Sequence, residues 1–166
     1  MPTIEEYARQ PIQERVERLG RTADELATAI KDRDEATLAR RPDARNFAAK
    51  ECVCHLRDTE EVFTSRFEAM LAMDNPQFMP VDPARNERWA EERQYLKNDV
   101  QQAIAHFRRR RAESLDFLRK LAPAQLRRGG VHPPRGPITI DDLVTLMAWH
   151  DDNHLDQLRR ALEGRA

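Results

Sequence analysis

The 166-residue sequence predicts an all-α protein that folds as a single four-helix bundle. Apolar residues recur at helical spacing in four stretches of similar length, which is typical of amphipathic helices around one core. The chain has only 5 glycines and 6% aromatic residues, whereas a β sandwich or barrel needs many turns and strand-forming rings. Its length suits one hydrophobic core. We therefore expect residues 1–166 to form one domain.

The first two helices are expected over residues 12–31 and 48–73. The apolar stripe of the first consists of Ile12, Val16, Leu19, Ala23, Leu26 and Ile30. The inward positions of the second are Cys52, His55, Leu56, Thr59, Val62, Phe63, Phe67 and Met70. The connection between them, residues 32–47, contains a proline and is predicted to be a structured loop.

The third helix is expected over residues 97–121, and Pro123 lies just beyond its end, where it cannot continue the helix. The fourth begins at Thr139, which is a suitable N-cap followed by two acids that match the helix dipole. It ends at Gly164. The inward residues of these two helices are Val100, Ile104, Phe107, Leu115, Leu118, Leu121, Leu143, Met147, His150, His154, Leu158 and Ala161.

The connections between these helices differ in length. Residues 74–96 contain Pro76, Pro80 and Pro83 and are numerous enough to cross the whole bundle, whose helices measure roughly 30–40 Å at 1.5 Å per residue. The second and third helices can therefore run parallel, and a short amphipathic turn is expected around Trp89. Residues 122–138, with Pro-Pro and Gly-Gly pairs, are expected to form a structured loop.

The charge balance and hydropathy exclude several classes of partner. The 28 Lys and Arg residues nearly balance 29 Asp and Glu residues, for a formal net charge of -1. A generally basic nucleic-acid binder would not be so close to neutral, so we expect no nucleic-acid partner. No apolar run approaches the ~20 residues of a membrane span. The first residues, MPTIEEYARQ, do not resemble a signal peptide.

The two cysteines, Cys52 and Cys54, indicate a reducing compartment. Residues two apart on a helix point about 200° apart and cannot form a disulfide within that helix. We expect both to be free thiols and the protein to be cytoplasmic.

The strongest candidate site consists of His55, His150 and His154. Histidines four apart on a helix lie about 40° apart around its axis, so His150 and His154 can converge on one metal ion. Three neutral imidazoles from two facing helices form a site for a divalent ion, with positions left open for water or substrate. The alternative is that these are core histidines hydrogen-bonded to the backbone, since the H-x-x-x-H spacing also arises by chance.

The other titratable candidates have simpler interpretations. Cys52 could be a fourth ligand, but a buried small hydrophobe is the preferred interpretation. Cys54 points elsewhere. His106 is expected to face solvent. His132 is expected to be a plain loop residue, and the alternative is that it lies at the rim of a pocket that leads to the metal.

A run of four arginines, residues 108–111, wraps a full helical turn. We expect a solvated face, with at least one arginine leaning towards the core and paired with an acid such as Glu60 or Glu61. The functional alternative is an anion clamp for a carboxylate-bearing cofactor.

Two sets of residues resemble motifs of the DinB-like superfamily of metalloenzymes. In the last helix the family pattern is G-x-x-T-x-x-x-L followed by H-x-x-x-H-x-x-Q. This chain has Gly136, Thr139, Leu143, His150, His154 and Gln157 there. In the second helix the pattern is E-x-x-x-H-L-x-D-x-E, and the chain has Glu51, His55, Leu56, Asp58 and Glu60. One departure concerns Phe47, where many relatives have Trp.

The resemblance implies an up-down-down-up bundle with a long connection between helices 2 and 3. It implies a divalent metal on His55, His150 and His154, with zinc or nickel favoured and iron or manganese as alternatives. It also implies kinship to thiol-dependent S-transferases and to a thiol-dependent isomerase.

The leading hypothesis is thus a metal-dependent enzyme that transfers a low-molecular-weight thiol to an electrophile, the thiol acting as co-substrate and nucleophile. The catalytic residues remain unassigned. Metal-dependent hydrolysis is the enzymatic alternative, and a non-catalytic metal- or ligand-binding stress-response protein is the alternative from another class. A homodimer is a further expectation.

Overall fold

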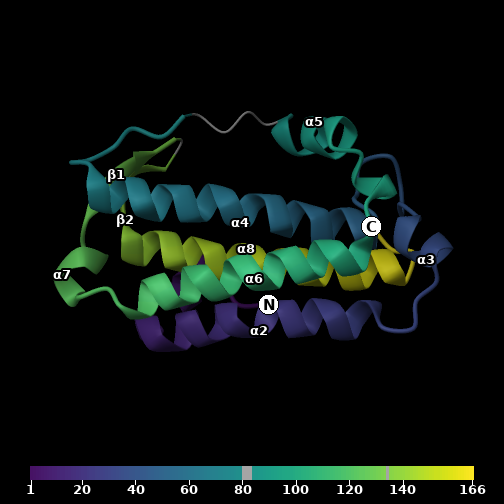
Figure 1. The fold of residues 1–166 in the computed structure, drawn as a ribbon, viewed down its shortest axis with the longest axis horizontal. Coiled ribbons are helices and arrows are strands. Elements are labelled where there is room, and N and C mark those ends of the chain that lie inside the picture. The colour runs from purple at the N-terminus through teal and green to yellow at the C-terminus, as the bar shows by residue number, and fades with distance from the viewer. Residues whose placement is uncertain (80–83, 134) are drawn as a thin grey trace.

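A computed structural model describes residues 1–79, 84–133 and 135–166. Its four long helices are α2 (Ile12–Ile30), α4 (Ala49–Ala72), α6 (Val100–Arg119) and α8 (Ile140–Leu162). Helices α2 and α8 run in one direction along the bundle, and α4 and α6 run in the other (Figure 1). The predicted all-α, up-down-down-up four-helix bundle is therefore confirmed.

The long helices lie close to the predicted ranges. The largest difference is at the start of α6, where Asp99 is the N-cap and accepts a hydrogen bond from the backbone N of Gln102 at 2.8 Å. Thr139 caps α8, and its side chain accepts from the backbone N of Asp142. After α8, Gly164 has a φ of 72°, a left-handed conformation that glycine adopts without steric cost.

Short elements precede or join the long helices. They are α1 (Ile4–Ala8), α3 (Glu35–Ala39), α5 (Arg85–Glu92), the 3-10 turn η1 (Tyr95–Lys97) and α7 (Pro123–Leu126). Helix α5 confirms the amphipathic turn predicted around Trp89, and with η1 it lies over α4 (Figure 1). Pro80 and Pro83 of the predicted connection lie outside the described residues. Helices α1, α3 and α7 were not predicted.

The prediction of a loop over residues 122–138 is wrong, because much of this segment forms a β-hairpin. Strands β1 (Gly129–His132) and β2 (Gly136–Thr139) pair antiparallel, with His132 opposite Gly136. Backbone bonds extend the pairing to the segment after α4: the N of Val131 donates to the O of Pro76 at 2.9 Å, and the N of Phe78 donates to the O of Val131 at 3.0 Å. The hairpin is thus fixed beside the end of α4 by contacts remote in sequence.

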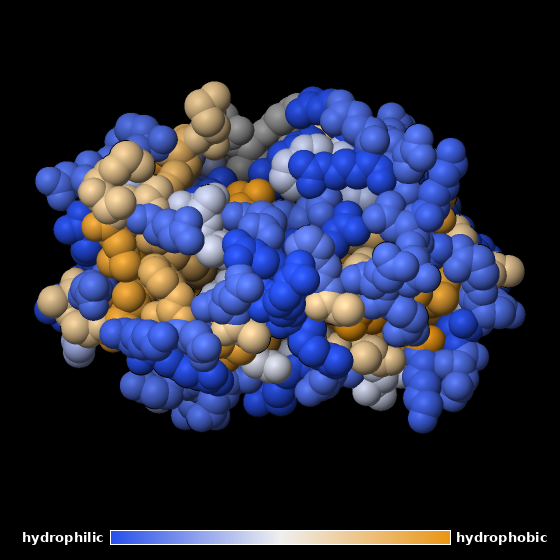
Figure 2. Space-filling model, viewed as in Figure 1, coloured by the Kyte–Doolittle hydropathy of each residue, from blue (hydrophilic) through white to orange (hydrophobic). Residues whose placement is uncertain are grey.

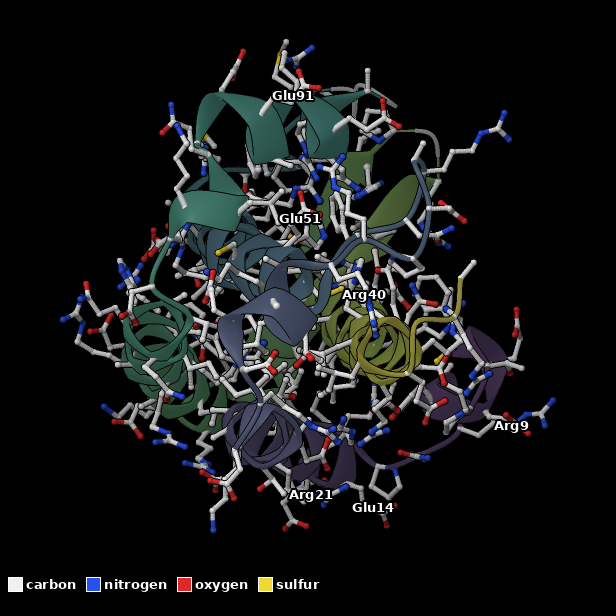
Figure 3. All side chains as sticks on the ribbon, turned by 90° about the vertical axis from the view of Figure 1, so that its right-hand side faces the viewer. Arg9, Glu14, Arg21, Arg40, Glu51 and Glu91 are labelled. Carbon is white, nitrogen blue, oxygen red and sulfur yellow. The ribbon has the colours of Figure 1, made fainter. Side chains whose placement is uncertain are left out.

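The core follows the predicted stripes. Seen from one end in Figure 3, α2 and α4 occupy opposite corners of the bundle and α6 and α8 the other two, while Arg9, Glu14 and Arg21 lie at the periphery. The predicted inward positions are buried except Ile12, Val62, Leu121 and His150, which are partly exposed. This burial supplies the main driving force for the fold.

A buried ionic cluster lies among the four helices. The guanidinium of Arg111 on α6 donates to Glu60 of α4 at 2.9 Å and to Asp151 of α8 at 2.5 Å. Thr22 of α2 also donates to Asp151, at 2.6 Å. The expectation that an arginine of the 108–111 run leans inward and pairs with Glu60 or Glu61 is confirmed. Burying these charges is tolerable only because each is paired and hydrogen-bonded.

The surface is mostly hydrophilic in the view of Figure 2, and apolar residues gather towards the end where α7 and β1 lie. Within the described ranges, no helix is both long enough and apolar enough to cross a membrane.

Candidate metal centre

The fold brings His55, His150 and His154 together. His55 comes from α4, and the other two come from successive turns of α8, which packs beside α4. One ring nitrogen from each histidine can be chosen so that the three atoms lie within 4.8 Å of one another. Nε2 of His55 and Nε2 of His150 lie 3.2 Å apart. Two nitrogens that bind one tetrahedral zinc ion at about 2.0–2.1 Å lie roughly 3.3 Å apart, so this spacing fits shared ligation.

The protonation chemistry of the cluster also fits a metal site. Burial is the main cause that lowers the pKa of all three imidazoles, and the neighbouring His154 lowers the pKa of His55 and His150 further. The rings are therefore neutral at pH 7, the form in which histidine binds a metal. The Nδ1 atoms of His55 and His150 are buried without a hydrogen-bond partner among the described residues. Three imidazoles packed together in a protein interior are costly unless a ligand binds the lone pairs that face one another.

Gln157 orients one of the three rings. Its Oε1 lies 2.8 Å from Nδ1 of His154. Because an amide oxygen can only accept, Nδ1 must carry the proton and Nε2 keeps its lone pair. Such a bond behind a histidine ligand fixes its tautomer and ring orientation. The motif glutamine thus has a physical role next to the cluster.

Two phenylalanines flank the histidines. The ring of Phe47 lies 5.7 Å from that of His55, and the ring of Phe63 lies 5.5 Å from that of His150. Many members of the DinB-like superfamily have Trp at the position of Phe47. The residue in which this chain departs from the family pattern therefore packs next to His55.

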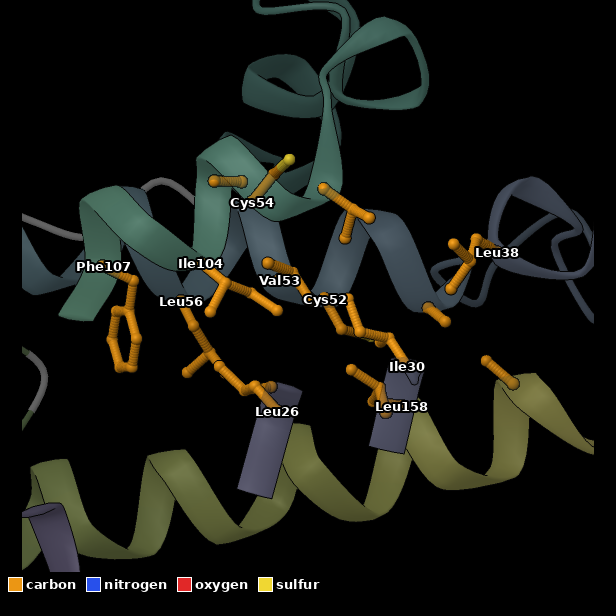
Figure 4. Close-up of a cluster of buried hydrophobic side chains, with 14 of the residues drawn as sticks. Leu26, Ile30, Leu38, Cys52, Val53, Cys54, Leu56, Ile104, Phe107 and Leu158 are labelled. Atoms are coloured by element: carbon orange, nitrogen blue, oxygen red, sulfur yellow. The ribbon is translucent and has the colours of Figure 1, made fainter. Parts of the chain in front are cut away.

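Neither cysteine belongs to the cluster. Cys52 is fully buried and packs with Ile30 and Leu158 in the hydrophobic core (Figure 4). Burial strongly raises the pKa of its thiol. Cys54 lies on another side of α4, where its thiol donates to the carbonyl of Tyr95 at 3.8 Å. Both are free thiols, as predicted. The structure therefore favours the interpretation of Cys52 as a buried hydrophobe.

The acids of the α4 motif are structural anchors. Glu51 lies inside the molecule near the turn before α4 (Figure 3), where it accepts hydrogen bonds from Arg41 and from the backbone N of Ala48. Asp58 accepts from Tyr95 at 2.8 Å and from two arginines. Glu60 belongs to the buried ionic cluster. These acids tie the loop before α4, the segment after α5, and α6 to the helix that carries His55.

The two aspartates between His150 and His154 have similar roles. Asp151 is bound to Arg111, and Asp152 accepts from Arg18 at 2.7 Å and from Tyr7. They hold α8 against α6, α2 and α1. With its acids engaged in this way, α8 presents only imidazoles to the cluster.

A pocket of about 260 Å³ opens beside His150. His132 lines it, together with Phe63 and three arginines. The interpretation of His132 as a plain loop residue is wrong: it is 6% exposed, in β1, and lies at the pocket. His106 is exposed, as predicted. Sequence reasoning missed the arginines Arg66, Arg85 and Arg135, because they come from separate segments with no common spacing.

Fold and site together define a candidate metalloprotein of the four-helix-bundle class, with a three-histidine cluster at the edge of a small pocket. The model of the DinB superfamily matches residues 18–158, so the chain belongs to that superfamily. The resemblance seen in the motifs is confirmed.

Two relatives carry related descriptions. The chain is 30% identical over 132 residues to a candidate metal-dependent hydrolase of Bacillus mycoides, covering 79% of this chain and 73% of that protein. It is 28% identical over 110 residues to a similarly named protein of Oceanobacillus iheyensis, covering 66% of this chain and 61% of the relative.

The structure is also similar to a solved one. It resembles YfiT from Bacillus subtilis, described as a probable metal-dependent hydrolase with an unusual four-helix bundle topology. The TM-score is 0.83 at 20% identity, and the match covers 100% of this chain and 92% of that one. At this identity the likeness shows the shared fold.

Proposed function

We propose that the protein is a metal-dependent enzyme that holds a divalent ion on His55, His150 and His154 and transfers a small thiol to an electrophile. The observation that carries the proposal is the convergence of three neutral imidazoles at a pocket that reaches His150. A metal with three protein ligands keeps a position for substrate, as catalytic sites do. Zinc or nickel suits an all-imidazole set, with iron or manganese as alternatives.

When bound, a divalent ion supplies Lewis acidity that lowers the pKa of a coordinated thiol. The chain's own residues bind and orient. Gln157 holds the proton of His154 on Nδ1, and Phe47 and Phe63 pack against the other two rings. In the reaction, a bond forms between the thiol sulfur and the electrophile. The bond to the leaving group breaks with its electron pair, and the thiol proton passes to solvent.

Metal-dependent hydrolysis is the second candidate, favoured by the descriptions of the relatives. The pocket supports thiol transfer better. Its described lining residues include no carboxylate that could act as a general base towards water. A divalent ion can ionise a bound water as well as a bound thiol, but a free thiol already ionises near pH ~8.5 and water only near pH ~15.7, so the thiol needs the smaller shift.

Calorimetry with a matched pair of ligands tests the proposal. Metal-loaded protein is titrated with N-acetylcysteine and with N-acetylserine, which differ only in sulfur for oxygen, in two buffers of different ionisation enthalpy. We expect the thiol to bind at least ten-fold more tightly and to release a proton. His154→Ala should abolish this preference, and His106→Ala, at an exposed histidine of α6, should preserve it.

Equal binding of both ligands, or no binding, contradicts thiol transfer and makes metal-dependent hydrolysis the preferred candidate function. Thiol binding without turnover of a reactive aryl halide favours the non-catalytic alternative. A cytoplasmic location, a homodimer and a role in stress response remain predictions.

A further inference from the structure

The pocket beside His150 is rich in cations. Its lining includes Arg66, Arg85 and Arg135. The remaining described lining residues are neutral: Thr59, Val62, Phe63, His132, Leu146 and His150. A concave surface with charges of one sign concentrates ligands of the opposite sign.

Arg66 is held in place by groups that do not neutralise it. From α4, its Nη1 donates to Nε2 of His132 at 3.0 Å, and its guanidinium lies 5.3 Å from the ring centre of Phe78. Burial and the positive charge of Arg85 both lower the pKa of Arg66, and no carboxylate of the described residues counteracts them. A partly buried cation without a counter-charge is costly, and an anion would stabilise it.

His132 is the hydrogen-bond partner of Arg66. Because a guanidinium can only donate, Nε2 of His132 accepts and its proton lies on Nδ1. That Nδ1 is buried and has no partner among the described residues. Burial lowers the pKa of this imidazole overall, although the backbone carbonyls of His132 and Pro133 lie close enough to raise it. His132 is therefore a neutral acceptor that orients Arg66.

From this arrangement we propose that the pocket binds the anionic group, a carboxylate or a phosphoryl group, of a small-molecule substrate beside the metal centre. Arg66 and Arg135 supply the positive charge, and His132 positions Arg66. The volume of about 260 Å³ lies just below the ~300–1,000 Å³ of sites for drug-sized ligands, so the occupant is a small metabolite. That the bound anion belongs to a substrate rests on the proposed function. The anion site itself does not depend on that function.

The arginine run of residues 108–111 does not provide a competing clamp. Arg108 pairs with Asp24, Arg110 with Glu61 and Arg111 with Glu60 and Asp151. Three of its four guanidiniums are thus already bound to carboxylates of the chain. The fourth, Arg109, is exposed and serves as a matched control.

The test measures binding of succinate, methylphosphonate and the neutral succinamide to metal-loaded protein by calorimetry. We expect at least one of the two anions to bind ten-fold or more tightly than succinamide, and the preferred anion identifies the group. Arg66→Gln should weaken that anion at least ten-fold and Arg135→Gln several-fold. Arg109→Gln should leave it unchanged. Arg135 is exposed, so its variant keeps the test valid if Arg66→Gln does not fold.

His154→Ala separates this proposal from the proposed function, because His154 is not among the residues that line the pocket. Metal content is measured in the same samples. Loss of metal with retained anion binding supports both proposals. A different result would overturn the arginine site: anion binding that is lost together with the metal and that neither Arg66→Gln nor Arg135→Gln weakens. The anion would then bind to the metal itself. Anion binding in wild-type protein that never contains metal supports the anion site and contradicts the metal-dependent function.

Discussion

Arg111 of α6 and Asp151 of α8 form an ion pair in which both side chains are buried, with Nη1 and Oδ2 2.5 Å apart. Asp151 directly follows His150, so the Arg111–Asp151 ion pair fixes the rotation of α8 about its own axis at the level of the histidine cluster. The same guanidinium binds Glu60, five residues beyond His55 on α4. The cluster therefore sets the relative position of the two helices that carry the histidines.

Removing this guanidinium should be costly. Arg111→Met leaves two carboxylates buried without a counter-charge, which typically costs about 3–5 kcal/mol. Arg109→Met, the same substitution at an exposed neighbour, should change the free energy of unfolding by less than about 0.5 kcal/mol. Urea denaturation of both variants measures the difference. A loss below about 1 kcal/mol in Arg111→Met contradicts the structural role assigned to the pair.

Much of this fold was accessible from sequence. The period of 3.6 residues placed all four long helices, and the stripes located His55, His150 and His154 on the inside. The β-hairpin was missed because the Pro and Gly pairs of residues 122–138 were interpreted as a loop, and the backbone bonds of Val131 to Pro76 and Phe78 lie more than fifty residues away in sequence. The arginine pocket was missed because its residues come from separate segments. Spacing along the chain carries no signal for residues that meet only in space, and burial of charged groups such as Arg111 depends on partners from other helices.

The hydrogen bond from Gln157 should matter for metal affinity. Gln157→Leu removes the acceptor that fixes the tautomer of His154, and loss of such a partner typically weakens metal binding 10–100-fold. Competition with a chromogenic chelator measures the affinity. Gln102→Leu, at an exposed position of α6, is the control. Equal affinities in the two variants contradict the orienting role of Gln157.

Asp58 should make stability depend on acid pH. Burial raises the pKa of this carboxyl, but hydrogen bonds from Arg57, Arg93 and Tyr95 outweigh it, and the net pKa lies below its ordinary value. A carboxyl with a lowered pKa in the folded state contributes stability above its unfolded pKa of ~3.9. This contribution is lost as the pH falls through the folded value.

We therefore expect Asp58→Asn to lower the Tm at pH 7 and to lie closer to wild type at pH 3. Asp116→Asn, at an exposed position of α6, should differ little from wild type at either pH. A Tm difference for Asp58→Asn that is the same at both pH values contradicts the assignment.

Cys52 should stay outside the metal coordination. A cobalt-substituted protein with imidazole ligands alone should lack the intense near-ultraviolet charge-transfer band that a thiolate ligand produces. The spectrum of Cys52→Ala should match that of the wild type. A band present in the wild type and absent from this variant would show that the thiol is a fourth ligand and that the site is closed.

The most direct test of the three-histidine centre is the metal content of protein purified without an affinity tag, measured by elemental analysis. We predict about one divalent ion per chain in the wild type and in His106→Ala, and a loss of most of it in His150→Ala and in His154→Ala. Full metal stoichiometry in both of the latter variants, with their helical circular dichroism intact, would contradict the assignment.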